Sequence, residues 1–71
     1  MTWNKPVFSR MVKQIGYDSE TKELLVYWHT GRVSAYAGVD EAKAWEVSNA
    51  ASVGDLVNNE IKPNFSHKYR R

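Results

Sequence analysis

The chain has 71 residues, a net charge of +2, no cysteine and two histidines. Without cysteine no disulfide can form, and two histidines cannot supply the roughly four ligands of an ordinary structural zinc site. The sequence also lacks both the apolar run of roughly 20 residues that a membrane helix needs and the apolar stretch of a signal peptide. We therefore expect one small intracellular domain that uses no metal or cofactor and depends on its hydrophobic core alone.

The charge is unevenly distributed along the chain. Residues 1–17 and 62–71 carry only basic charges, whereas all eight acidic residues lie within residues 18–61. Basic ends around an acidic middle suggest an acidic partner, either nucleic acid or an acidic protein surface. Ends that are simply exposed to solvent explain the same pattern equally well.

Residues 1–8 show no periodic pattern, and Pro6 favours extended backbone at its own position and the one before it. We interpret these residues as an extended arm. Trp3 is unusual in such an arm, because it has no core of its own to pack into. It either packs back on the domain or anchors a binding partner, since tryptophan is enriched among interface hot spots.

Three strands are predicted over residues 9–17, 23–29 and 32–39. The second has the clearest pattern, with Leu24, Val26 and Trp28 on one face and largely apolar residues on the other, which is typical of a central strand. A polar turn over residues 18–22 and a Thr30–Gly31 hairpin turn join the strands. Such short connections favour an antiparallel meander.

Two helices are predicted after the strands, over residues 40–49 and 52–61. Asp40 and Ser52 are the expected N-caps, and Pro63 ends the second helix. The predicted fold class is therefore α+β: a three-stranded antiparallel β-meander, then two short helices packed on one face, with flexible N- and C-terminal tails. The predicted divisions are an arm over residues 1–8, one domain over residues 9–65 and a basic tail over residues 66–71.

No catalytic constellation is recognisable in the sequence. A nucleophile needs a base within hydrogen-bond reach and a third group that orients the base, and His29 beside Thr30 is a single generic histidine. The four glycines are dispersed and form no phosphate-binding loop. We therefore expect a monomeric binding protein and no enzyme.

A series of short motifs gives the sequence a family signature. In order they are Ile15-Gly16-Tyr17-Asp18, Leu24-x-Val26-x-Trp28, Gly31, Tyr36-x-Gly38-Val39, Ala50-x-Ser52-x-Gly54, Ile61 and Phe65. Over residues 9–65 this pattern resembles the KTSC domain, named for a C-terminal extension of some lysyl-tRNA synthetases. The resemblance implies RNA or tRNA binding. Ser34 stands where the family has the first tyrosine of Tyr-x-Tyr, which weakens a base-stacking role there, and Asp40 stands where it has proline.

The arm with Trp3 also makes the chain similar to a small class of phage transcription regulators. That resemblance implies a protein of the bacterial cytoplasm that binds host RNA polymerase, inhibits initiation and suppresses termination. The expected partner-binding residues lie in the arm and at the start of the domain: Trp3, Asn4, Lys5, Pro6, Phe8 and Arg10. This is the favoured hypothesis, because the arm suits docking on a large assembly.

Direct RNA binding is the alternative hypothesis. The expected contacts are basic side chains of the strands and tail: Lys13, Arg32, Lys62, Lys68, Arg70 and Arg71. Such side chains neutralise phosphates, while Tyr27, Tyr36 or Tyr69 can stack on bases. The acidic residues of the helical half would repel phosphate, so binding would use the sheet side or the tails.

Overall fold

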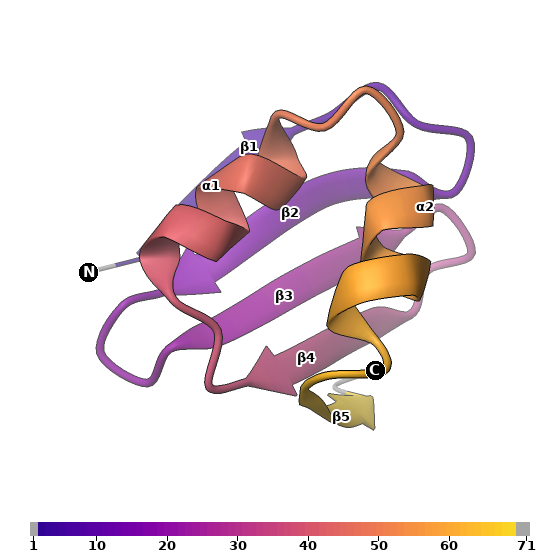
Figure 1. Ribbon diagram of the computed structural model, residues 1–71. Coiled ribbons are helices and arrows are strands. Elements are labelled where there is room, and N and C mark those ends of the chain that lie inside the picture. Colours follow the sequence, from indigo (N-terminus) through magenta and orange to yellow (C-terminus); the bar gives the residue numbers. More distant parts are fainter. Residues whose placement is uncertain (1, 70–71) are drawn as a thin grey trace.

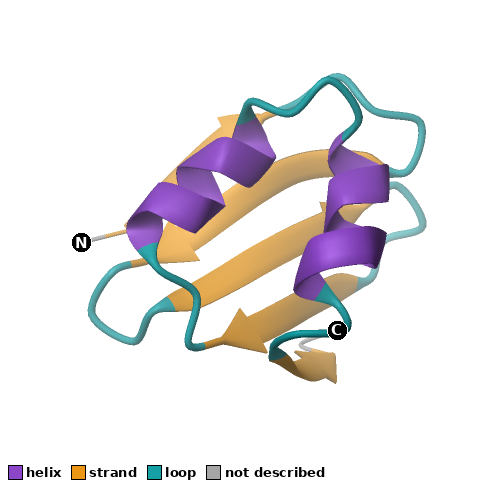
Figure 2. Ribbon diagram, in the orientation of Figure 1, coloured by secondary structure: helices purple, strands orange, loops and turns teal. Residues whose placement is uncertain are grey.

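The structure is a computed structural model that describes residues 2–69. Its sheet has five antiparallel strands in sequence order, β1 to β5, and its helices cover one face of that sheet (Figures 1 and 2). The elements in chain order are β1 (Thr2–Pro6), β2 (Val12–Asp18), β3 (Glu23–Trp28), β4 (Val33–Ala37), α1 (Glu41–Ser48), α2 (Val53–Leu56), the π-helical turn η1 (Val57–Ile61) and β5 (Ser66–Tyr69). The predicted α+β class, with antiparallel strands and helices on one face, is confirmed.

The predicted number of strands is wrong, because the sheet has five strands and not three. Thr2–Pro6, expected to lie in a flexible arm, pairs with β2, and Ser66–Tyr69, expected to lie in a flexible tail, pairs with β4. In a three-stranded sheet β2 and β4 would each leave a row of backbone N–H and C=O groups unpaired. The two end segments satisfy those groups, which is the usual advantage of covering a sheet edge.

The β3–β4 hairpin closes as its sequence predicts. Gly31 has φ of 95°, a left-handed conformation that costs glycine little, and its N–H donates to the Trp28 carbonyl at 3.0 Å. The Trp28 N–H in turn donates to the Arg32 carbonyl at 2.9 Å. This tight turn fixes the register that places β4 beside β3.

The core lies between the sheet and the helices. Side chains from the strands, among them Ile15, Leu24 and Val26, pack against Val47 and Val57 from the helical half, and all of these are fully buried. Tyr17 belongs to the same cluster, and its hydroxyl donates to the Val39 carbonyl at 2.6 Å. The alternation seen in the sequence of β3 therefore selects the buried face correctly.

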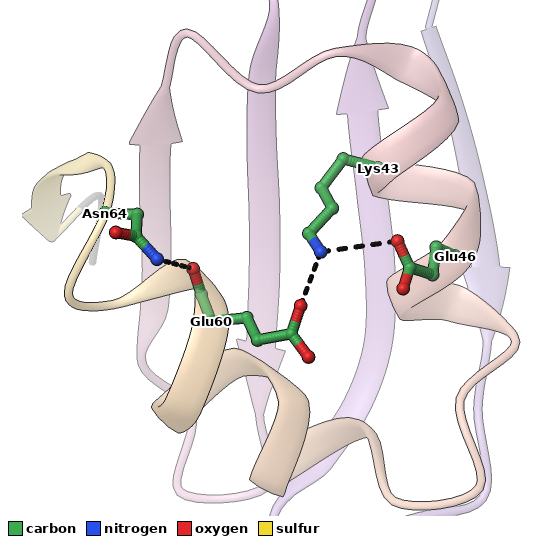
Figure 3. A network of polar contacts seen from close by, with 4 residues as sticks. All are labelled: Lys43, Glu46, Glu60 and Asn64. Atoms are coloured by element: carbon green, nitrogen blue, oxygen red, sulfur yellow. Dashed lines mark hydrogen bonds and ion pairs between the residues drawn. The ribbon is translucent and has the colours of Figure 1, made fainter.

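Lys43 joins the two helical segments (Figure 3). Its Nζ donates to Glu60 Oε1 at 2.6 Å and to Glu46 Oε1 at 3.3 Å.

Asp40 stands at the N-cap of α1 as predicted, but its side chain makes no capping hydrogen bond. The single second helix predicted over residues 52–61 is observed as α2 followed by η1. Within residues 2–69, no helix has the length and apolar character needed to cross a membrane.

Candidate functional site

A groove of about 340 Å³ opens at the end of the sheet where β3 turns into β4. Figure 1 shows the β3–β4 turn and the β1–β2 connection on the same side of the molecule as α2, and the pairing of Tyr69 with Ser34 brings the last described residue of β5 toward this side. We call this site the hairpin groove and define it by its lining residues: Arg10, Met11, Trp28, His29, Thr30, Arg32, Ser34, Tyr36, Asn58, Lys62, His67 and Tyr69.

The pairing of β4 with β5 builds one wall of the hairpin groove. The register sets Tyr36 opposite His67 and Ser34 opposite Tyr69, so all four side chains share the helix-covered face. Ser34 and Tyr36 are each only 1% exposed and form the floor, where Ser34 Oγ accepts a hydrogen bond from Trp28 Nε1 at 2.8 Å. This wall thus has the buried side chains of β4 at its base and the exposed side chains of β5 at its rim.

Aromatic rings follow one another along this wall. The rings of Tyr36 and His67 lie 4.9 Å apart with an interplanar angle of 31°, and His67 meets Tyr69 edge-on at 4.5 Å. Burial raises the pKa of Tyr36 above its ordinary value, although a hydrogen bond with Ser34 acts in the opposite direction. The Tyr36 hydroxyl therefore stays neutral at physiological pH, and Tyr69 at the rim, 60% exposed, offers a ring to a ligand.

The charge of the hairpin groove is basic. Arg10, Arg32 and Lys62 line it, and no carboxylate occurs among its lining residues in the described part of the chain. The Arg32 guanidinium lies 5.3 Å from the centroid of the Tyr69 ring, within cation–π distance. Cations beside exposed rings are the combination that holds single-stranded nucleic acid, since cations neutralise phosphates and rings stack on bases.

The structure brings together only part of the predicted nucleic-acid surface. Arg32 and Lys62 lie in the hairpin groove, whereas Lys13 is not among its lining residues and Lys68 lies on the opposite face, in register with Ala35. Arg70 and Arg71, also predicted as contacts, lie outside the described residues. Of the tyrosines considered for stacking, Tyr36 and Tyr69 line the hairpin groove, while Tyr27 lines a hollow on the other face, beside Leu25 and Asn4.

The predicted partner-binding residues do not form one surface. Trp3 packs on the helix-covered face, with ring centroids 5.8 Å from Tyr17 and 5.4 Å from Trp45, and its Nε1 donates to Glu41 Oε2 at 3.2 Å. Lys5 lies on the same face, over the Trp45 ring at 4.7 Å, and donates to Asn49 Oδ1.

The remaining residues of the predicted arm point elsewhere. Asn4 alternates with Trp3 and Lys5 along β1 and so lies on the opposite face, as does Pro6. Phe8 is fully exposed in the β1–β2 connection, and Arg10 lines the hairpin groove. The predicted partner-binding residues are therefore divided among the helix-covered face, the open face of the sheet, an exposed connection and the groove.

Several groove residues were missed by the sequence reasoning, among them Trp28, Asn58 and His67. One signal was present in the tail, where His67 and Tyr69 are two positions apart and so share a face in any strand. Four residues are too few for that alternation to predict a strand by itself.

Fold and groove together define a small α+β domain with a basic, ring-lined groove at one end of an antiparallel sheet. The family model of the KTSC domain matches residues 8–65, and the chain therefore belongs to the KTSC domain family. This confirms the resemblance seen in the sequence.

The structure is also similar to the crystal structure of a KTSC domain protein from Yersinia pestis. The TM-score is 0.83 at 28% sequence identity, and the match covers 96% of each chain. No match was found among curated proteins.

Proposed function

We propose that this protein is a non-enzymatic module that binds single-stranded RNA in the hairpin groove. The observation that carries the proposal is the convergence of Arg10, Arg32 and Lys62 with exposed rings in one groove whose described lining contains no carboxylate. Stacking on such rings requires bases that are not paired in a duplex, which is why the proposed ligand is single-stranded.

The acidic residues of the helical half support this choice of surface. Asp40, Glu41, Glu46, Asp55 and Glu60 are not among the residues that line the hairpin groove. Their charges disfavour an approach of phosphate over the helices, so the open end of the sheet is the direction from which a nucleic acid meets attractive charge.

The test is a fluorescence anisotropy titration of a short single-stranded RNA at several salt concentrations. The double variant Arg32→Gln/Lys62→Gln removes two groove cations. For single strands log K falls with log salt with a slope of roughly −0.7 per phosphate contact, so this slope is expected to become shallower by about 1.4. The double variant Lys13→Gln/Lys68→Gln is the matched control, because it removes the same charge from outside the groove and is expected to keep the slope.

Two results would contradict the proposal. The first is an absence of binding by the unmodified protein even at about 50 mM salt, where phosphate contacts are strong. The second is an equal loss of affinity and slope in both double variants, which would indicate attraction by overall charge and no particular groove.

Phe8 supports a second candidate function, the docking of the protein on bacterial RNA polymerase as a transcription regulator. Phe8 is fully exposed in the connection between two strands, so its ring is available to a partner, and phenylalanine is enriched in protein interfaces. The rest of the expected arm lends less support, because Trp3 is packed against Tyr17 and Trp45.

Deleting residues 1–8 is a poor test of docking, because it removes β1 from the sheet. The substitution Phe8→Ser is cleaner. It is expected to abolish retention of purified bacterial RNA polymerase on the immobilised protein, whereas Met11→Ser is the control at the neighbouring exposed apolar position. Undiminished retention by the Phe8 variant would exclude this docking contact.

A further inference from the structure

The aromatic wall of the hairpin groove comes in part from a strand that lies beyond the family match. The match ends at residue 65, and β5 follows at Ser66–Tyr69. The family model therefore does not include the positions of His67 and Tyr69, which line the groove.

Burial in the core does not account for these side chains either, although the His67 ring lies 4.9 Å from that of the core residue Tyr36. All four residues of β5 are exposed, and none belongs to the hydrophobic cluster or to the partly buried residues packed against it. By contrast, β1 at the other edge of the sheet contributes Trp3 to that packing. The backbone of β5 covers the edge of β4, but any residues with strand propensity would do that. The histidine and tyrosine need a different explanation.

We propose that β5 supplies the base-contacting surface of the hairpin groove, with the Tyr69 ring stacking on an unpaired nucleobase while Arg10, Arg32 and Lys62 hold the flanking phosphates. This inference rests on the proposed function and adds to it the residue that reads the base. Its ligand is a single-stranded oligonucleotide that must carry bases, as distinct from any polyanion.

The surroundings of Tyr69 favour this assignment. Ser34, its register partner on β4, has a small side chain that is 1% exposed, so no large neighbour on that strand covers the tyrosine ring. His67 meets Tyr69 edge-on at 4.5 Å, and the Arg32 guanidinium lies 5.3 Å from the ring centroid. The ring is thus held by a neighbour yet remains 60% exposed, next to a cation that can pair with a phosphate.

The test compares an oligoadenylate with an abasic oligomer of equal length and equal phosphate number. Both have the same charge, so their difference in affinity measures contacts with bases. The unmodified protein is expected to bind the oligoadenylate about tenfold more tightly, the effect of one stacked base. The variant Tyr69→Leu is expected to lose this preference while keeping the salt slope, and Tyr69→Trp is expected to retain the preference because it restores a stacking ring.

Tyr27→Leu is the matched control, because Tyr27 lines a hollow on the opposite face of the sheet and is expected to leave the preference unchanged. A preference that survives in Tyr69→Leu, or equal binding of both oligomers by the unmodified protein, would overturn the role of Tyr69 and leave RNA binding itself standing. Failure of both oligomers to bind would overturn the proposed function, and this inference with it.

Discussion

At the scale of single residues, Ser34 changes the interpretation of the family pattern. By the resemblance noted in the sequence it takes the place of a tyrosine, which predicted the loss of a stacking ring. Ser34 is nearly fully buried, accepts a hydrogen bond from Trp28 and lies in register with Tyr69. The ring of Tyr69 therefore lies beside Ser34, although it belongs to the neighbouring strand β5.

Tyr17 is a core residue whose hydroxyl group makes a buried hydrogen bond. It is 2% exposed, and its hydroxyl donates to the Val39 carbonyl at 2.6 Å. We predict that Tyr17→Phe lowers the free energy of unfolding by about 1–2 kcal/mol at neutral pH, because it leaves a buried carbonyl without its donor. Urea denaturation measures the loss, and a change within about 0.5 kcal/mol, typical of surface substitutions, would contradict the prediction.

The same residue gives a prediction for alkaline pH. Burial, followed by the charges of Glu41, Asp40 and Asp18, raises the pKa of Tyr17 above 10.0. The folded state then holds the proton at pH values where the unfolded chain has lost it. The contribution to stability is complete below the unfolded pKa and is lost as pH rises above about 10.

Urea denaturation between neutral pH and about pH 11 checks this dependence. The decline in the free energy of unfolding is expected to be shallower in Tyr17→Phe, although Tyr36, whose pKa burial also raises, keeps part of it. An identical decline in both proteins would show that Tyr17 does not titrate differently on folding.

At the scale of elements, the two edge strands have different roles. β1 belongs to the packing, because Trp3 contacts both the core residue Tyr17 and Trp45 of α1. β5 has no such anchor, and all its residues are exposed. Backbone pairing therefore explains why a strand forms at each edge. β1 also packs Trp3 against the core, whereas the side-chain contacts of β5, such as that of His67 with Tyr36, lie at the surface.

We predict that Trp3→Ala lowers the free energy of unfolding by about 2 kcal/mol, less than for a fully buried tryptophan because Trp3 keeps some exposure. Phe8→Ala, a few positions away and fully exposed, is the control and is expected to change stability by less than about 0.5 kcal/mol. Chemical denaturation followed by far-UV circular dichroism measures both. Equal effects of the two substitutions would mean that Trp3 is not anchored.

At the scale of the whole molecule, the ion pairs of the helices and the basic side chains of the groove lie in different places. Lys43 pairs with Glu46 and Glu60 between the helical segments (Figure 3), while Arg10, Arg32 and Lys62 converge at the turn end of the sheet. An acidic partner therefore meets favourable charge at the groove. The two edge strands also differ from each other, because β1 contributes Trp3 to the core packing whereas the residues of β5 are exposed.

Truncation from each end tests this division. Deleting residues 1–7 removes Trp3 and Val7, both packed against the core, whereas deleting residues 66–71 removes β5, whose four residues are all exposed. The two deletions cost similar numbers of backbone pairs, so we predict a clearly larger loss of stability from the first. Thermal unfolding of both proteins decides the matter, and an equal or larger loss from the second deletion would contradict the prediction.

The sequence by itself determined the parts of this protein that depend on local pattern. The alternation of Leu24, Val26 and Trp28, the turn at Gly31 and the helix signals at Asp40 and Ser52 were sufficient for β2 to β4, for the positions of the helices and for the family. These features are encoded within a few consecutive residues, and their physical causes, side-chain period and turn conformation, are equally local.

Only the tertiary structure decided where Thr2–Pro6 and Ser66–Tyr69 lie and which side chains meet. β1 and β5 are too short to show a period, and they become strands because β2 and β4 offer unpaired edges. The groove likewise depends on register between distant segments, which brings Arg10, Arg32, Lys62 and Tyr69 together. Arg32 and Lys62 were identified from charge alone, but their convergence with a ring from the C-terminal strand is a property of the sheet and has no local signature in the sequence.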